Sequence, residues 1–357
     1  MFGIMINRQN MSRVIVSYTT DRKPGGISSS LVSYSQAMAI ANIQHIIILP
    51  SLAYVPEELK ALDNVRIIPC ATSRMRFDLA TRFAFNLELR RQFNAAGRVF
   101  IHNAKHIPAF SWLGRRALAV NHTGKTRFLE RIMDVVFLNK SVEGRFKKSF
   151  PSYQGKTRVI HHAFDLQGHA YHARNSTRPV SVICAGRLLI KKGVGDLIEA
   201  ARILQERDVN CIIRLVGAGE DELLFSQTIK DYGLKNIKIL PWSNNLAADL
   251  LAADIFCSPS HGESFGLVMG EAMRASLPIV STQTDGATEY VEQCEALFCL
   301  MSKVGDYVGL ADNIEKLAVD DELRSQFSRN AFEMISQHFS LDRLAQDFEG
   351  LLNDFSG

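Results

Sequence analysis

The chain has 357 residues, which exceeds one ordinary domain and predicts two domains of about 170 residues each. Its 46% hydrophobic residues suffice for two buried cores, and no apolar run is long enough to span a membrane. The net charge of +4 hides an asymmetry: residues 1–178 carry 26 Lys and Arg against 10 Asp and Glu (+16), whereas residues 179–357 carry 15 against 27 (−12). This asymmetry indicates an anionic partner, and the absence of nucleic-acid motifs argues against nucleic acid.

The cysteines and the amino terminus favour a cytoplasmic protein. None of the six cysteines forms a CxxC pair, and several lie in apolar strand-like runs, so we expect buried reduced thiols. The first eleven residues lack the long apolar segment of a secretory signal. The first clear strand starts just after Met11, which leaves both Met1 and Met11 open as the translation start.

The first half reads as alternating buried strands and helices. Strands are expected at 13–18, 46–50, 65–69, 99–102, 117–120 and 134–138. Between the first two strands, Gly25 and Gly26 open a helix over 27–41, with Ser28 or Ser29 as its cap. A glycine pair before a helix allows close approach of a ligand, but a plain turn is the alternative reading.

Residues 73–93 predict an amphipathic helix. Phe77, Ala80, Ala84 and Leu87 recur at helical spacing, and basic residues surround them. The basic residues are Arg74, Arg76, Arg82, Arg90 and Arg91. Two interpretations stay open: a surface helix that packs on the sheet, or an interfacial helix that docks peripherally on an anionic membrane.

Two histidines follow strands at the edge where parallel sheets bind ligands. His102 ends the strand at 99–102, and His122 follows the strand at 117–120 and precedes Thr123 and Gly124. A lone histidine is often structural, so placement at a strand end makes these two only candidates for an active site. Four further histidines at 161, 162, 169 and 172 lie in a linker-like stretch and lack any recognised zinc spacing.

The second half opens with a strand at 180–185 and continues with strands at 212–216, 237–240, 255–257 and 278–282. Arg187 and Lys192 lie five residues apart, between the first of these strands and a helix over 194–207. Two cations so placed can neutralise a diphosphate without a metal, and no Asp-x-Asp motif follows a strand. We therefore expect a metal-independent site with no cofactor.

The stretch from Ile255 to Arg274 (IFCSPSHGESFGLVMGEAMR) predicts a strand, a glycine-bearing loop and a helix from Leu267. This order directs backbone N–H groups and the positive end of the helix dipole at the loop, which suits a phosphate or a sugar hydroxyl. Glu263 in the loop and Glu271 in the helix lie eight residues apart.

Here the chain resembles the retaining glycosyltransferases of family 4. Their signature is a glutamate, seven residues and a second glutamate, with a Phe-Gly-Leu core after the first; Glu263 to Glu271 (ESFGLVMGE) has this form after Pro259-Ser260. The resemblance covers the second half densely and the first half sparsely. Residues 158–165 stand at the family's hinge but lack its usual turn, which puts donor contacts there in doubt.

The resemblance implies roles for particular residues. Glu263, His122, Arg187 and Lys192 are the expected catalytic residues: the histidine lies beside the sugar, and the two cations stabilise the leaving diphosphate. Glu271 would accept the ribose hydroxyls. The other expected donor-binding residues, besides Arg187 and Lys192, are Gly25, Gly26, Gly217, Trp242, Ser264, Phe265, Gly266 and Leu267, the last three through backbone N–H groups.

We therefore predict an α/β fold of two Rossmann-like doubly wound domains that face a central cleft, the GT-B architecture. The expected domains are an acceptor-binding domain at 1–165, a donor-binding domain at 176–340 and a helix at 341–357 that packs back on the first domain. The expected enzyme moves a hexosyl unit from a nucleoside-diphosphate sugar to a glycan or glycolipid, in the synthesis of lipopolysaccharide or another envelope polysaccharide. The alternatives are a non-catalytic sugar-nucleotide-binding protein and a glycoside hydrolase that uses Glu263 and Glu271.

Overall fold

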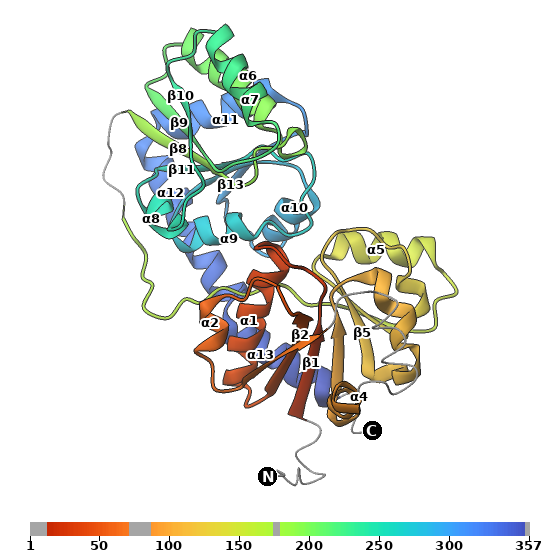
Figure 1. The fold of residues 1–357 in the computed structure, drawn as a ribbon. Coiled ribbons are helices and arrows are strands. Elements are labelled where there is room, and N and C mark those ends of the chain that lie inside the picture. The colour runs from red at the N-terminus through yellow and green to blue at the C-terminus, as the bar shows by residue number, and fades with distance from the viewer. Residues whose placement is uncertain (1–12, 71–86, 174–178, 354–357) are drawn as a thin grey trace. The chain divides into compact units, whose positions relative to one another are not determined.

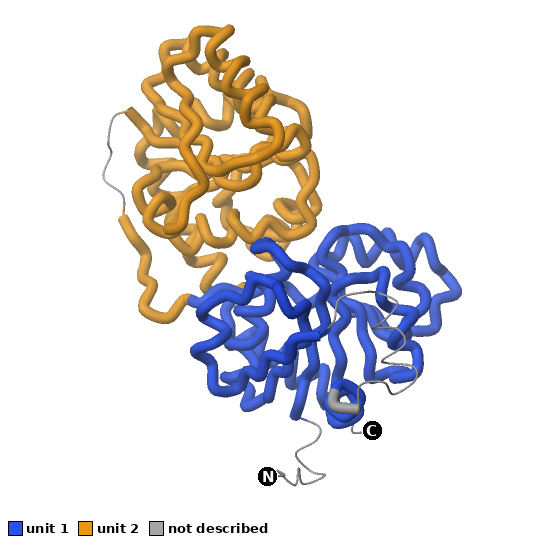
Figure 2. The backbone as a smooth tube through the Cα atoms, viewed as in Figure 1, with its two compact units in different colours: residues 1–165, 340–357 blue, residues 166–339 orange. Residues whose placement is uncertain are grey.

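The computed structural model describes residues 13–70, 87–173 and 179–353. The chain divides into two compact units, shown in blue and orange in Figure 2. Unit 1 comprises residues 1–165 and 340–357, and unit 2 comprises residues 166–339. Each unit is built on its own parallel sheet.

The described strands of unit 1 form a seven-stranded parallel sheet in the order β3-β2-β1-β4-β5-β6-β7 (Figure 1). The chain reverses its direction of travel across the sheet between β1 and β4, and ligands bind at such a switch point in doubly wound folds. The strands are β1 (Val14–Tyr18), β2 (Gln44–Pro50), β3 (Val65–Cys70), β4 (Arg98–Ile101), β5 (Ala117–Asn121), β6 (Asp134–Phe137) and β7 (Lys156–Val159).

Helices cover both faces of this sheet because successive strand residues point to opposite sides. Ile15 packs in the cluster under α1 and α13, whereas Val14 and Val16 pack in the cluster on the other face. The helices are α1 (Gly26–Ile40), α2 (Glu57–Lys60), α4 (Leu87–Ala95), α5 (Lys140–Ser149) and α13 (Leu341–Asn353), with 3-10 helices η2 (Ala104–Arg116) and η3 (Leu129–Arg131).

The last helix belongs to unit 1, although it follows unit 2 in the sequence. Phe348 of α13 packs edge-on against Tyr34 of α1, with ring centroids 5.1 Å apart. The buried Arg98 donates to the carbonyl of Leu351 (3.0 Å) and to Asp134 Oδ2 (3.1 Å). It thereby satisfies one of the carbonyls that the end of a helix leaves without an intrahelical partner. Burial lowers the pKa of Arg98 to about 10, and Asp134 partly offsets this.

The described strands of unit 2 form a six-stranded parallel sheet in the order β10-β9-β8-β11-β12-β13. Numbered within the unit, this is the 3-2-1-4-5-6 order of dinucleotide-binding folds, with its switch point between β8 and β11. The strands are β8 (Val180–Ala185), β9 (Cys211–Val216), β10 (Ile237–Leu240), β11 (Ile255–Ser258), β12 (Ile279–Thr282) and β13 (Cys299–Ser302).

The helices of unit 2 pack on the sheet through fully buried apolar side chains such as Leu197 and Ile314. They are α6 (Val194–Glu206), α7 (Glu222–Asp231), α8 (Leu246–Leu251), α9 (Leu267–Arg274), α10 (Asp285–Val291), α11 (Tyr307–Val319) and α12 (Asp321–His338), with the 3-10 turn η4 (Ile190–Lys192). No helix in the described part of the chain is both long and apolar enough to cross a membrane.

Some sequence expectations differ from the structure. The cap of α1 is Gly25, not a serine; its N–H donates to the Ser28 hydroxyl (2.9 Å), which lies inside the helix. The stretch expected to be a hinge begins inside β7. Most of the expected amphipathic helix at 73–93 lies outside the described residues, and only its end is seen, in α4. The alternative start at Met11 also lies outside them.

Candidate active site

In unit 2, two loops meet at the switch point of the sheet. One follows β8 and contains Arg187 and η4; the other follows β11 and leads into α9. The His261 N–H donates to the carbonyl of Lys191 at 3.1 Å, which joins the loops through their backbones. Gly193, with φ +69°, allows this approach: a Cβ there would lie 1.8 Å from the Pro259 carbonyl oxygen. The two loops therefore form one surface.

On this surface Lys192 and Glu263 form an ion pair. The Lys192 ammonium lies 2.5 Å from Glu263 Oε2, and both side chains are about 29% exposed. The pair joins two of the residues that the sequence predicted to be catalytic, from positions 71 residues apart. A partly exposed pair is weakly stabilising, so a polyanionic ligand can compete with Glu263 for the lysine.

Arg187 lies in the same loop and is exposed. In the part of the chain that the structure describes, its guanidinium has no ion-pair partner. An unpaired arginine beside a paired lysine leaves this surface with one uncompensated positive charge. That charge suits a phosphate group, which a guanidinium binds through two N–H donors.

The helix α9 begins at this surface. Its amino-terminal cap is Gly266, whose φ of 84° favours glycine, and Leu267 is its first residue. The Met269 N–H already donates to the Gly266 carbonyl at 3.0 Å, so the N–H groups at the very start of the helix are the ones that can serve a ligand. Glu271 lies one turn further in; burial raises its pKa, and Arg274 partly counters this.

The signature loop is held from beneath by aromatic packing. The buried Phe265 ring lies 4.9 Å from the Tyr290 ring and 5.8 Å from the Phe339 ring between centroids. The Gly286 N–H donates to the Glu263 carbonyl at 2.8 Å. The Phe265 side chain therefore anchors the loop, while Ser264 beside it is half-buried.

Two further residues predicted to bind the donor lie at the ends of neighbouring strands. Gly217 follows β9, and a Cβ there would lie 1.9 Å from the Gly186 carbonyl oxygen, so this loop lies directly beside the one after β8. Trp242 follows β10 and its side chain is 56% exposed. An exposed indole can stack on a flat ring such as a nucleobase.

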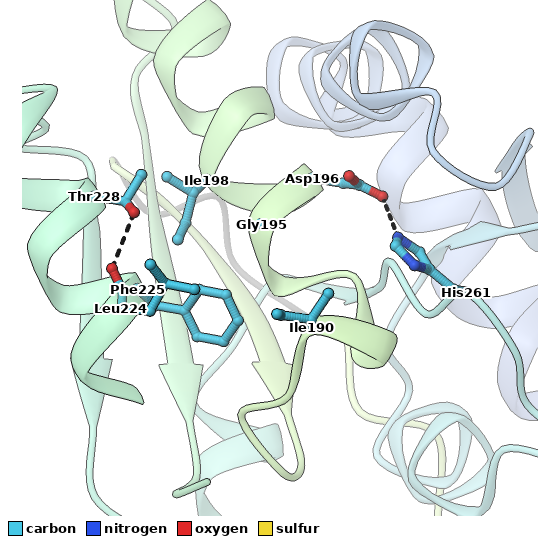
Figure 3. Close-up of a pocket in the computed structure, with 8 residues that line it drawn as sticks. All are labelled: Ile190, Gly195, Asp196, Ile198, Leu224, Phe225, Thr228 and His261. Atoms are coloured by element: carbon cyan, nitrogen blue, oxygen red, sulfur yellow. Dashed lines mark hydrogen bonds and ion pairs between the residues drawn. The ribbon is translucent and has the colours of Figure 1, made fainter. Parts of the chain in front are cut away.

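An apolar pocket of about 210 Å³ lies in unit 2 among η4, α6, α7 and His261 (Figure 3). Ile190, Ile198 and Phe225 contribute apolar wall, and His261 Nε2 lies 2.7 Å from Asp196 Oδ2 at one side. The described residues that line it include no Lys or Arg, so it lacks the charge that a diphosphate needs. Asp196 and His261 lie 65 residues apart, so no local pattern in the sequence indicates this pair.

Unit 1 has polar groups at its own switch point. Gly25 and Gly26 are exposed at the start of α1. Asn103, which follows β4, accepts a hydrogen bond from the N–H of Thr20, which follows β1, at 2.6 Å. This asparagine was not singled out in the sequence; a polar residue just after a predicted strand was the available signal.

His122 directly follows β5 and is partly exposed. Its Nε2 lies 2.8 Å from Nδ1 of His102, and the two rings are nearly parallel at 24°. The ring also stacks on His162, with centroids 5.8 Å apart. Loss of solvent around the packed ring lowers the pKa of His122 to about 4, so the imidazole is neutral at physiological pH.

Unit 2 is similar in sequence to known glycosyltransferases. Residues 171–334 match the family model of glycosyl transferases group 1. The chain is 26% identical over 174 residues to the capsular polysaccharide biosynthesis glycosyltransferase CapM of Staphylococcus aureus, across 48% of this chain and 45% of CapM.

A second relative is the lipopolysaccharide core biosynthesis glycosyltransferase LpsE of Rhizobium meliloti. It is 28% identical over 172 residues, across 48% of this chain and 49% of LpsE. The chain thus spans about half the length of the curated relatives it matches. The match to the group 1 domain contains Arg187, Lys192, Glu263 and Glu271 and ends before α13.

Similarity of structure extends to both units. The crystal structure of Anabaena Alr3699/HepE in complex with UDP and glucose superimposes with a TM-score of 0.76 at 18% identity, across 96% of this chain and 99% of that chain. At this identity the likeness shows the fold. It confirms the predicted class of two Rossmann-like domains of the GT-B type.

Proposed function

We propose that the protein is a retaining glycosyltransferase that moves a hexosyl unit from a nucleoside-diphosphate sugar to a glycan or glycolipid acceptor. The observation that carries this proposal is the ion pair between Lys192 and Glu263 at the switch point of the group 1 domain. It joins a cation suited to a diphosphate to a carboxylate suited to sugar hydroxyls. The UDP and glucose bound by the structural relative HepE support this class of donor.

The donor occupies the surface formed by the two loops of unit 2. Arg187 and Lys192 bind the diphosphate, and Glu271 accepts hydrogen bonds from the ribose hydroxyls. The backbone N–H groups from Ser264 to Leu267 hold sugar hydroxyls, and Glu263 orients the transferred sugar once the phosphates have taken its lysine. Gly217 and Trp242 border the nucleoside. In unit 1, Gly25 and Gly26 allow backbone N–H groups to approach the donor phosphates or the acceptor.

The reaction breaks the bond between the anomeric carbon and the diphosphate oxygen. The two cations stabilise the negative charge that develops on the leaving diphosphate, which is electrostatic catalysis. A leaving phosphate oxygen takes the proton of the acceptor hydroxyl on the same face of the sugar, so the configuration is retained. His122 accepts a hydrogen bond from a hydroxyl of the sugar or the acceptor. No protein nucleophile is required.

The acceptor is proposed to be an envelope glycan or glycolipid, by analogy with the capsular and lipopolysaccharide relatives. A peripheral contact with an anionic membrane fits the charge of +16 on residues 1–178. In the described part of that stretch, Arg90 of α4 lies over the exposed Trp112 of η2, 5.9 Å from its ring centroid, and Arg115 is exposed nearby in sequence. Each basic residue near an anionic surface contributes about 1 kcal/mol.

The donor proposal is tested by a thermal-shift panel of nucleoside diphosphates and their sugars. One base is expected to raise the melting temperature, because a ligand that binds only the folded state stabilises it by mass action. Incubation of that donor with envelope glycolipids should then release the diphosphate. Binding without turnover on any acceptor would favour the non-catalytic alternative. Cleavage of a glycoside in the absence of nucleotide would favour the hydrolase.

The membrane contact is tested separately by co-sedimentation with anionic and neutral vesicles. The protein should pellet with anionic vesicles at low salt and leave them at high salt, because the attraction is screened. The double variant Arg90→Gln, Trp112→Ala should bind less, with Lys230→Gln in unit 2 as the control. If the wild type stays in the supernatant with anionic vesicles at low salt, the membrane contact is wrong.

A further inference from the structure

A continuous chain of hydrogen bonds runs through the core of unit 1 to His122. Ser35 Oγ lies 2.7 Å from His45 Nδ1, and His45 Nε2 lies 2.8 Å from Ser17 Oγ. Ser17 Oγ lies 3.1 Å from His102 Nε2, and His102 Nδ1 lies 2.8 Å from His122 Nε2. These residues come from α1, β2, β1 and the ends of β4 and β5, so the chain crosses the centre of the sheet.

The imidazoles of this chain are neutral. Burial lowers the pKa of His45 to about 3 and of His122 to about 4, and it also lowers the pKa of His102. His102 faces His162 and the Tyr34 ring, and the positive charge of Arg343 near His162 is paired with the Asp347 carboxylate. Each ring therefore carries one proton and one lone pair, and each link has one donor and one acceptor.

The inner end of the chain sets its direction. The Ser35 hydroxyl donates to the carbonyl of Leu31 at 2.8 Å, so its oxygen accepts from His45 Nδ1–H. His45 Nε2 then has only a lone pair, and it accepts from the Ser17 hydroxyl. The opposite direction would take the Ser35 proton away from the Leu31 carbonyl.

The outer half of the chain of hydrogen bonds has the same direction. Because the Ser17 hydroxyl donates to His45, its oxygen accepts from His102 Nε2–H. His102 Nδ1 is then a lone pair and accepts from His122 Nε2–H. The remaining nitrogen, Nδ1 of His122, carries a lone pair and has no hydrogen-bond partner among the residues that the structure describes.

We propose that Ser35, His45, Ser17 and His102 are positioning residues that fix His122 as its Nε2–H tautomer and present its Nδ1 as an acceptor for a substrate hydroxyl. This rests on the proposed function only for the identity of the substrate, a sugar or an acceptor alcohol. A neutral acceptor holds a hydroxyl in place without competing for the proton that the leaving phosphate takes. His122 contacts the substrate, and the four inner residues determine which of its two ring nitrogens carries the free lone pair.

The tautomer is measured directly by two-bond nitrogen–proton NMR spectra of the protein labelled with ¹⁵N-histidine, with His122→Gln to assign the signals. In the wild type, His122 should show protonated Nε2 and unprotonated Nδ1 from pH 6 to 8. A wild-type His122 protonated at Nδ1 overturns the proposal. This measurement needs neither a substrate nor a functional variant.

Two variants test the chain itself. Ser17→Ala removes the acceptor of His102 Nε2–H, and Ser35→Ala removes the acceptor of His45 Nδ1–H. A buried N–H without a partner is costly, so each variant should shift the chain to the opposite direction and protonate His122 at Nδ1. Ser33→Ala is the control, because the buried Ser33 hydroxyl bonds only to the Ser30 carbonyl among the described residues. If one of the two variants does not fold, the other still tests the chain.

The kinetic consequence is a fall in kcat of about tenfold in both variants, the size expected for one lost hydrogen bond, with nucleotide Kd unchanged. If the His122 tautomer is unchanged in both folded variants, the hydrogen-bond chain does not set the tautomer and the proposal is wrong. A changed tautomer with unchanged kcat overturns its functional role. If the wild type transfers no sugar at all, the proposed function fails, and the spectra still decide the tautomer.

Discussion

The two units share a strand order but place their charges differently. In unit 1, Arg98 is buried against Asp134 and a helix carbonyl, and a chain of neutral histidines fills the centre of the sheet. In unit 2, Arg187 and Lys192 stand on exposed or half-exposed loops at the switch point. A buried charge must be satisfied within the protein, whereas an exposed one is free for a ligand. The comparison indicates that the fixed polar groups of unit 1 orient other side chains, whereas the accessible charges of unit 2 are available to bind a ligand.

The largest effect is expected from the buried charge of unit 1. Arg98→Met removes the Leu351 carbonyl's donor and the buried partner of Asp134, which keeps only the exposed Arg115 at 3.7 Å, and it should lower the free energy of unfolding by about 3–5 kcal/mol. Urea unfolding measures this. Arg13→Met is the control: Arg13 pairs with Glu349 of α13 at 3.2 Å, but on the exposed surface. Equal losses in the two variants would contradict the distinction between buried and exposed charge.

The accessible charge of unit 2 is expected to act on turnover instead. Lys192→Ala should lower kcat by about 100- to 1000-fold, the loss typical of removing one group that stabilises transition-state charge. Lys191→Ala is the matched control, because its side chain is exposed and lies one residue away on η4. The stability of both variants should stay close to that of the wild type. Comparable kcat values for the two variants would show that Lys192 has no special role.

The two glutamates of the signature should separate binding from turnover. Glu271→Ala should weaken nucleotide binding by about 10- to 100-fold, because it removes charged hydrogen bonds to the ribose. Glu263→Ala should affect nucleotide affinity less and lower turnover, since this carboxylate contacts Lys192 and, as proposed, the sugar. Calorimetric titration with the nucleotide measures both. Equal losses of affinity would reject the division of roles.

Acid should destabilise unit 1 before unit 2. His45, which is buried, and His122, whose ring packs against His102 and His162, have folded-state pKa values of about 3 and 4, below the ordinary value of 6.5. Between pH 6.5 and 4 the unfolded chain binds more protons, so stability is complete above pH 6.5 and falls by about 1.4 kcal/mol per pH unit per histidine below it. None of the histidines that the structure describes in unit 2 is buried. Hydrogen exchange that rises equally in both units on acidification would contradict this.

The smallest effect is the one expected from chelation. Activity should be unchanged in EDTA, because Arg187 and Lys192 supply the positive charge that a metal would otherwise bring to the diphosphate. An assay with and without EDTA checks this, with Mn²⁺ or Mg²⁺ added back. Loss on chelation and recovery with either ion would overturn it.

The sequence predicted the local structure of the unit 2 loops better than the side-chain arrangement in unit 1, for a physical reason. The loops after β8 and β11 are local stretches, each readable as a strand, a polar loop and a helix start, and an apolar run such as 180–185 marks its strand at the observed bounds. The strand order could be inferred only as a class. The strands β7 and β13 were missed: only Val159 of the four residues of β7 (KTRV) is apolar, so this strand lacks the apolar run that marks the others.

The chain of hydrogen bonds through the histidines could not be predicted from the sequence. Ser17, His45 and His102 lie on different strands, and only the sheet order β2-β1-β4 brings them together. A serine within a buried strand and a histidine after another carry no local pattern that links them. His122 was singled out for its place after a strand, yet the residue that orients it could be chosen only from the structure.

The central claim is that unit 2 binds a nucleoside-diphosphate sugar, and that the sugar is transferred to the acceptor with its anomeric configuration retained. The most direct measurement follows a donor with a ¹³C-labelled anomeric carbon by NMR, in the presence of envelope glycolipids. The account predicts a new glycoside signal with the anomeric configuration of the donor, equimolar release of the nucleoside diphosphate, and no such signal with Lys192→Ala. A product of inverted configuration, or no transfer from a donor that binds, would contradict it.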